Sequence, residues 1–223
     1  VNHYLNSAKA FFRWMVDELL SECNPTDIQR ILFPIGSDLF NADGNSNMTF
    51  LGTPQDMDTR YYRLIRETRK LLVECIDLCL QVAPTDIVMV MDNHSPESIF
   101  HTGESLECWY ASNKHVTVDN TPLTRKYYNF QNNLIGFTHG DKEKVADLPM
   151  LMAHEAKSHW GKCTFYEFQK GHTHTGKLTG KVVQKTDPLE SIEGVRIRTI
   201  PALTARSAWA AGKGFIDVRS SHG

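Results

Sequence analysis

Two short apolar runs separated by one long helical pattern constrain the fold of this chain more than any other feature. Residues 30–35 (RILFPI) and 86–91 (DIVMVM) are nearly continuous apolar runs, which is typical of buried strands. Residues 60–82 carry the longest helical pattern in the chain, and Pro84 follows its end. Because strand, helix and strand follow one another, we expect a sheet with parallel strands and helices packed outside it.

The remaining patterns continue this alternation through the first half of the chain and give way to strands in the second half. Further helices are expected over residues 8–23, 96–110 and 147–159, and strands over 115–118, 127–130, 134–138, 165–169, 195–200 and 214–218. Gln131-Asn132-Asn133 predicts a hairpin turn between two of these strands. A parallel sheet joined to antiparallel strands makes this an α/β protein, expected as one domain over residues 1–223.

Composition narrows the classes of partner. The net charge of −2 argues against a strong electrostatic grip on nucleic acid over the whole surface, but it leaves a local basic groove open. The candidate lysines for such a groove are Lys142, Lys144, Lys170, Lys177 and Lys181. Each of them is also compatible with an ordinary solvated surface. No apolar run reaches the length of a membrane span, and no signal-peptide pattern opens the sequence. Five cysteines without a CxxC pair predict reduced thiols in a cytoplasmic protein.

Residues of the types that bind metals follow four of the predicted strands. They are Asp38 after the first strand, Asn93 with His94 after the second, His139 after the second hairpin strand, and His172 with His174 after the strand over 165–169. In an open α/β sheet the carboxyl ends of the strands lie along one edge, so these side chains are expected to meet. Oxygen and imidazole ligands together suit Mn²⁺, Fe or Zn²⁺ better than Ca²⁺.

Each of these residues also has an ordinary explanation. A loop aspartate such as Asp38 often caps a turn, Asn93 by itself fits a turn, and His139 fits a core or surface histidine. One His-x-His sequence, as at His172 and His174, also arises by chance. Taken one at a time, the ordinary explanations are preferred. The ordered set at the ends of four predicted strands instead favours a metal site.

The order of these residues resembles that of a known superfamily. Residues 35–44 (IGSDLFNADG), 137–144 (FTHGDKEK), 148–156 (LPMLMAHEA) and 171–174 (GHTH) look like blocks of the calcineurin-like metallophosphoesterases. More narrowly, they are similar to a phage and bacterial branch related to the double-strand-break repair exonucleases. The resemblance covers the chain roughly from residue 3 to residue 219.

This resemblance implies a four-layer αββα sandwich, with two mixed sheets between outer helices and a two-metal centre at the strand ends. The implied ligands are Asp38 bridging both metals, Asn93, His139 and His172 completing one site, and His174 serving the other. His94 is implied as a general acid or a stabiliser of the transition state. Mn²⁺ is the expected metal, with Zn²⁺, Fe and Mg²⁺ as alternatives.

The chain departs from the family pattern in four places. No Asp-x-His precedes Asp38, so we expect the sequence to be N-terminally incomplete. It would then lack both its first strand and two of the ligands of one metal. Asp92 replaces a glycine and is expected to strain the turn if a positive φ is required there. Ser95 replaces an acidic residue that would orient His94. Asn41 takes the place of a second active-site histidine, and an amide can contact phosphate but cannot act as a general acid.

These observations predict a metal-dependent phosphoesterase, a phosphodiesterase or nuclease that uses a hydroxide activated by two metals. The alternative is a catalytically impaired or non-catalytic relative that keeps the fold as a binding or structural protein. A histidine-rich metal-sequestering protein ranks last, because its ligands would cluster locally. The expected partner is a phosphoester substrate such as DNA or a nucleotide, with no membrane partner and with a homodimer left open. The expected location is the cytoplasm of a bacterium or of a phage-infected host cell.

Overall fold

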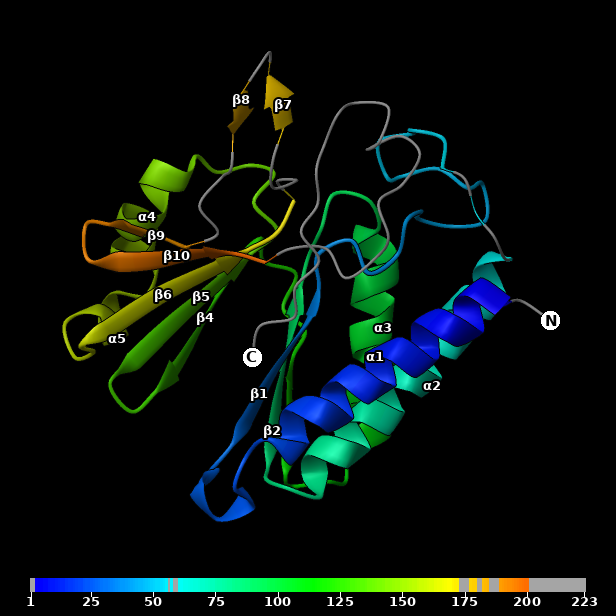
Figure 1. Cartoon of the computed structure of the whole chain (residues 1–223), viewed down its shortest axis with the longest axis horizontal. Coiled ribbons are helices and arrows are strands. Elements are labelled where there is room, and N and C mark those ends of the chain that lie inside the picture. Colours follow the sequence, from blue (N-terminus) through cyan, green and yellow to red (C-terminus); the bar gives the residue numbers. More distant parts are fainter. Residues whose placement is uncertain are drawn as a thin grey trace. The chain divides into compact units, whose positions relative to one another are not determined.

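The computed structural model describes residues 3–55, 57, 60–172, 177–179, 182–184 and 189–200. The chain divides into two compact units, residues 1–123 and 124–223. Each unit has its own sheet (Figure 1). Each unit also has its own apolar core. None of the described helices is long and apolar enough to cross a membrane.

The first unit is built on a parallel sheet. Its elements are α1 (His3–Ser21), η1 (Pro25–Asp27), β1 (Ile31–Gly36), α2 (Tyr61–Leu80), β2 (Thr85–Val90), α3 (Pro96–Tyr110) and β3 (Val116–Asp119). The described strands lie in the order β1-β2-β3, and all pairs are parallel. Gly36 at the end of β1 is paired with Val90 at the end of β2. The loops that follow these two strands therefore begin at the same edge of the sheet.

Burial of apolar side chains explains why these elements form. Every residue of β2 is buried, as expected for the central strand of a parallel sheet. Its Ile87 and Met89 belong to one apolar cluster with residues of α2 and α3, including Ile76 and Ile99. The buried residues of α2 recur at helical spacing and form one stripe: Thr68, Leu72, Cys75, Ile76 and Cys79.

Helix α1 lies alongside α2 (Figure 1) and is held by both apolar and charged contacts. Val16 packs in one cluster with Cys75 and Cys79 of α2. Lys9 donates a hydrogen bond to Glu67 at 2.6 Å. This ion pair joins the two helices across 58 residues of sequence.

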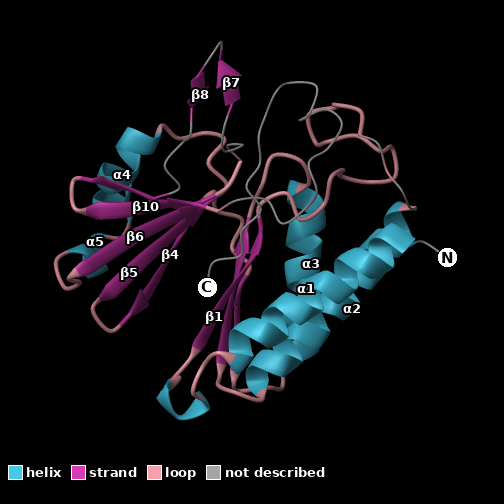
Figure 2. Ribbon diagram, in the orientation of Figure 1, coloured by secondary structure: helices cyan, strands magenta, loops and turns pink. Residues whose placement is uncertain are grey.

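The second unit is built on a mixed sheet (Figure 2). Its elements are β4 (Arg125–Phe130), β5 (Asn133–Thr138), η2 (Val145–Asp147), α4 (Leu148–Glu155), α5 (Lys157–Trp160), β6 (Phe165–Lys170), β7 (Lys177–Thr179), β8 (Val182–Gln184), β9 (Leu189–Ile192) and β10 (Val195–Thr199). The strand order is β4-β5-β6-β10-β9, and β7 pairs separately with β8. The pairs β5–β6 and β6–β10 are parallel, whereas β4–β5 and β9–β10 are antiparallel.

The core of this unit gathers side chains from neighbouring strands and from α4. Leu134, Phe168 and Ile197 come from β5, β6 and β10, and Met152 of α4 packs in the same cluster. Gly136 on β5 has to be a glycine, because a Cβ atom there would lie 2.8 Å from the ring of Phe168. The absence of a side chain at Gly136 thus makes room for the fully buried ring of Phe168.

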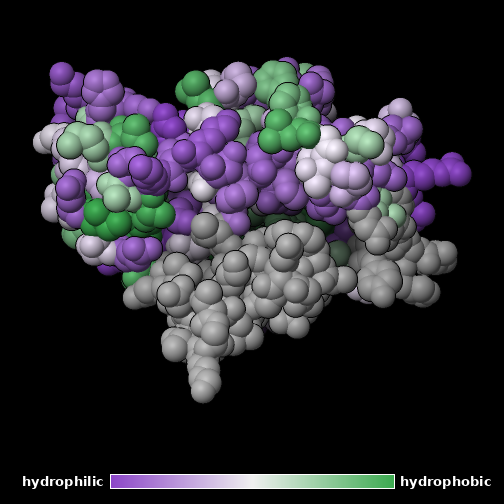
Figure 3. All heavy atoms as spheres, turned by 90° about the horizontal axis from the view of Figure 1, so that it is seen from above, coloured by the Kyte–Doolittle hydropathy of each residue, from purple (hydrophilic) through white to green (hydrophobic). Residues whose placement is uncertain are grey.

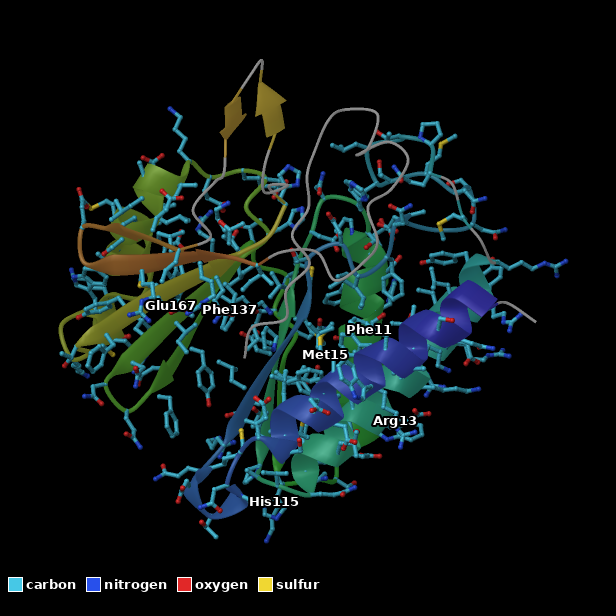
Figure 4. All side chains as sticks on the ribbon, viewed as in Figure 1. Phe11, Arg13, Met15, His115, Phe137 and Glu167 are labelled. Atoms are coloured by element: carbon cyan, nitrogen blue, oxygen red, sulfur yellow. The ribbon has the colours of Figure 1, made fainter. Side chains whose placement is uncertain are left out.

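Ion pairs link the strands of the second unit as well. Glu167 on β6, labelled in Figure 4, accepts a hydrogen bond from the guanidinium of Arg198 on β10 at 2.9 Å. Arg125 on β4 donates to Glu155 of α4 at 2.6 Å and to Glu143 at 2.5 Å. These contacts fasten α4 and the loop before it to the edge of the sheet.

The predicted α/β class with two sheets is confirmed. A single helix is predicted over residues 147–159, but the structure has two helices there, which follow a 3₁₀ turn. Ala156, where ψ is 33°, separates the two helices. The strands β7, β8 and β9 are absent from the sequence predictions. β9 reaches β10 through a turn at Glu193-Gly194, both with positive φ. The strand predicted over 214–218 lies outside the described residues.

Candidate functional site

The last residue of β1 and the first two residues of the loop that follows all have positive φ angles. The φ angles are 140° at Gly36, 57° at Ser37 and 65° at Asp38. A side chain at Gly36 is excluded, because a Cβ atom would lie 2.0 Å from the carbonyl oxygen of Val90. Positive φ costs free energy for residues other than glycine and gathers at functional sites. The backbone is therefore strained at Asp38, whose side chain is exposed.

Asp92, in the loop after β2, holds this strained turn in place. Its buried carboxylate accepts hydrogen bonds from the backbone N–H of Asp38 at 2.8 Å and of Ser95 at 2.6 Å. The hydroxyl of Ser95 donates to the same carboxylate at 3.2 Å. Burial raises the pKa of Asp92 above its usual value, and the hydrogen bonds from Ser95 and Asp38 oppose that shift. Asp92 has no positive φ, so the strain expected at this position does not arise.

Asn93 and His94 follow Asp92 at the same edge of the parallel sheet, so β1 and β2 deliver Asp38, Asn93 and His94 to neighbouring loops. His94 is half-buried, and its Nδ1 atom is buried without a hydrogen-bond partner among the described residues. Ser95 does not bond to this ring, because its hydroxyl is turned to Asp92. Asn41 is exposed three residues after Asp38.

The second unit contains a histidine pair at the ends of two neighbouring parallel strands. Thr138 at the end of β5 is paired with Lys170 at the end of β6, and His139 and His172 follow them. The Nε2 atom of His139 lies 3.0 Å from the Nδ1 atom of His172. His139 is only 1% exposed, whereas His172 is exposed.

The backbone around this histidine pair is fixed and locally strained. His172 has a φ of 60°, a left-handed conformation that is uncommon for residues other than glycine. The N–H of Gly171 donates to the carbonyl of His139 at 3.1 Å and joins the two loops. Gly140 has a φ of 91°, and a Cβ atom there would come within 3.3 Å of the carbonyl of Gly171. This turn therefore needs glycine at residue 140.

The separation of the two imidazole nitrogens fits two kinds of contact. In one, a ring N–H donates to the other ring, and the tautomers decide the direction. In the other, both nitrogens bind one ion, since ligand bonds of about 2.0–2.1 Å place two adjacent ligand nitrogens roughly 3 Å apart. A shared proton lies on the line between the two nitrogens, whereas an ion bound to both nitrogens would lie to one side of that line.

Lys170 lies directly before the Gly171-His172 turn and differs from the solvated lysine that the sequence predicts. It is buried at the end of β6, and burial lowers its pKa, while the charge of Glu190 raises it. Lys142 and Lys144 are exposed, as expected. The side chain of Lys177 and all of Lys181 fall outside the described residues.

Within each unit the predicted strand-end residues are brought together. Asp38 lies in a loop bonded to the loop of Asn93 and His94, and His139 contacts His172. His174 lies outside the described residues. The sequence patterns miss the role of Asp92, although aspartate in a turn often accepts a hydrogen bond from a backbone N–H a few residues later.

Comparisons of the chain with protein-family models, with curated proteins and with solved structures found no match. The strand-end geometry is therefore what a functional proposal has to explain. Two of the predicted metal ligands, Asp38 and His172, adopt left-handed conformations, and a third, His139, faces His172 at ligand spacing.

Proposed function

We propose that this protein is a metal-dependent phosphoesterase that acts on phosphodiesters such as nucleotides or DNA. The observation that carries the proposal is the pair His139 and His172, whose facing nitrogens lie 3.0 Å apart at the ends of adjacent parallel strands. A buried imidazole next to an exposed one is suited to hold an ion that remains open to substrate. Mn²⁺ is the preferred candidate for a mixed set of imidazole and oxygen ligands, with Zn²⁺, Fe and Mg²⁺ as alternatives.

In this proposal each residue has a defined task. His139 and His172 would hold the ion, and the resemblance in residue order assigns the role of oxygen ligands to Asp38 and Asn93. Bound metal ions would lower the pKa of a water molecule and polarise the phosphate. His94 would donate a proton to the leaving oxygen, the role that the resemblance in residue order implies. The resemblance to the metallophosphoesterase superfamily in residue order supports the same assignment.

One observation favours a non-catalytic metal-binding protein as the second candidate. The hydroxyl of Ser95 is bonded to Asp92, so it does not orient His94 as an acidic residue in its place would. Asn41 cannot replace a histidine as an acid. A protein of this kind would keep its metal and its fold but would not hydrolyse phosphoesters.

Metal analysis combined with hydrolysis assays distinguishes the two candidates. The purified protein is loaded with Mn²⁺, and hydrolysis of bis-p-nitrophenyl phosphate and of single- and double-stranded DNA is followed with and without EDTA. The proposal predicts bound Mn²⁺ and hydrolysis that EDTA abolishes. Bound Mn²⁺ without hydrolysis of any substrate identifies the non-catalytic protein, and hydrolysis that EDTA leaves unchanged contradicts the metal-dependent mechanism.

A further inference from the structure

The segment 48–53, in the long loop between β1 and α2, exposes three apolar side chains within four residues. Met48 is 41% exposed, Phe50 57% and Leu51 78%. On the face seen in Figure 3, apolar residues form separate small patches within a largely hydrophilic surface. An exposed apolar cluster costs hydration free energy, and such clusters often mark binding surfaces.

Hydrogen bonds fix this segment in the exposed conformation. The N–H of Thr49 donates to the carbonyl of Thr53 at 2.8 Å, and the N–H of Gly52 donates to the carbonyl of Thr49 at 2.8 Å. The hydroxyl oxygen of Thr49 also accepts from the N–H of Thr53 at 3.1 Å. Met48 forms an antiparallel bridge with Pro54. The apolar side chains are therefore held outward by an ordered turn rather than left out of the core by chance.

The same segment is attached to the candidate site of the first unit. The N–H of Phe50 donates to the carbonyl of His94 at 2.9 Å, so the backbone of Phe50 contacts the residue proposed as the acid. Asp43, earlier in the loop, accepts hydrogen bonds from the N–H groups of Glu97 at 3.1 Å and Ser98 at 3.0 Å at the start of α3. Two sets of bonds thus anchor the loop to the residues that follow Asn93.

We propose that Phe50 is a specificity residue that stacks on the nucleobase of a phosphodiester substrate. This inference rests on the proposed phosphoesterase function and assigns its substrate class as nucleotide phosphodiesters. An exposed aromatic ring offers a face on which any base can stack, and such stacking is insensitive to base identity. Met48 and Leu51, close to Phe50 in the sequence, are also exposed apolar residues. The net charge of −2 fits recognition that depends on stacking more than on a broad basic surface.

Two substrates with the same leaving group test this role. Thymidine 5′-(p-nitrophenyl phosphate) carries a base, and methyl p-nitrophenyl phosphate does not. Phe50→Ala is expected to raise KM for the thymidine ester about tenfold and to leave the methyl ester unchanged, while Phe50→Trp retains the wild-type KM. Phe165→Ala is the matched control, because this ring is 61% exposed but lies at the start of β6, far along the strand from His172. Equal KM values for Phe50→Ala and wild type on the thymidine ester overturn the inference.

A binding measurement separates failure of this inference from failure of the proposed function. If the wild type hydrolyses neither ester, the phosphoesterase proposal is wrong, and the affinity for a fluorescent oligothymidylate then tests Phe50 by itself. Binding that Phe50→Ala weakens about tenfold, with Phe165→Ala unchanged, supports the stacking role. Equal binding by wild type and Phe50→Ala, or no binding by either, overturns it. Circular dichroism and thermal unfolding confirm that the variants are folded.

Discussion

The carboxylate of Asp92 accepts a hydrogen bond from the backbone N–H of Asp38 at 2.8 Å. This bond joins the loop after β1 to the loop after β2, and it acts on a residue held in a left-handed conformation. The same carboxylate caps the turn at Ser95, which leads into α3. Asp92 stands where the family pattern has a glycine, and it is the hydrogen-bond acceptor that positions Asp38, a proposed metal ligand.

Replacing this acceptor tests its role. Asp92→Ala leaves the N–H groups of Asp38 and Ser95 without their acceptor, so the free energy of unfolding is expected to fall by about 1–3 kcal/mol. Affinity for Mn²⁺ is expected to fall as well, because the backbone of Asp38 is no longer fixed. Urea denaturation and calorimetric titration measure the two effects, with Asp17→Ala on the exposed face of α1 as the control. Stability and Mn²⁺ affinity equal to those of Asp17→Ala would show that the carboxylate has no such role.

Removal of one imidazole from the histidine pair should weaken metal binding. His172→Ala is the better variant, because His172 is exposed and its loss leaves no cavity in the core. The affinity for Mn²⁺ is expected to fall by more than the roughly 10- to 100-fold loss caused by removing a residue that only orients a ligand. Isothermal titration calorimetry measures this affinity. The control is His159→Ala, which removes an exposed imidazole from α5; equal losses in both variants would contradict the assignment.

The fold was predictable where one periodicity dominates. The apolar run 86–91 and the pattern over 60–82 correspond to β2 and α2, because full burial and a single buried stripe leave clear marks in sequence. β7 and β8 have three residues each and are too short to show a period of two. The break at Ala156 arises from backbone angles at one residue and leaves no compositional sign.

The sequence predicts which residues follow the strand ends, but it does not predict the contacts between their loops. Strand-end positions place Asp38 after β1 of the first sheet and His139 and His172 after β5 and β6 of the second sheet, because parallel strands of one sheet end at the same edge. The contact from Asp92 to Asp38 spans 54 residues, so no local pattern reveals it. The burial of Lys170 is also hidden, since lysine is rarely buried and Lys170 directly follows the strand predicted over 165–169.

The ion pair between α1 and α2 should make stability depend on acid pH. Lys9 and Lys70 lower the pKa of Glu67 from 4.5 to about 2, so the ionised carboxylate favours the folded state. Its contribution is present above pH 4.5 and is lost as the pH falls toward 2. Glu67→Gln is expected to lose roughly 0.5–1 kcal/mol at pH 6, with the difference from wild type shrinking across that window. Urea denaturation at several pH values checks this, and a constant difference would contradict it.

The cysteines should divide into fast and slow classes toward a thiol reagent. Cys23 and Cys108 are exposed, whereas Cys75, Cys79 and Cys163 are buried. Burial raises the pKa of Cys75 to about 12 and that of Cys79 to about 11. These two residues therefore carry almost no thiolate in the folded protein. With Ellman's reagent at pH 8, two thiols are expected to react at once and the others only after unfolding. Peptide mapping that finds Cys75 or Cys79 in the fast class would contradict the packing of α1 on α2.

The most direct test of the proposed metal centre is an anomalous difference map from a crystal prepared with Mn²⁺ and measured at the manganese absorption edge. The account predicts a peak within about 2.3 Å of both Nε2 of His139 and Nδ1 of His172. A map with no manganese at these two nitrogens, which remain 3.0 Å apart in a hydrogen bond, would contradict it.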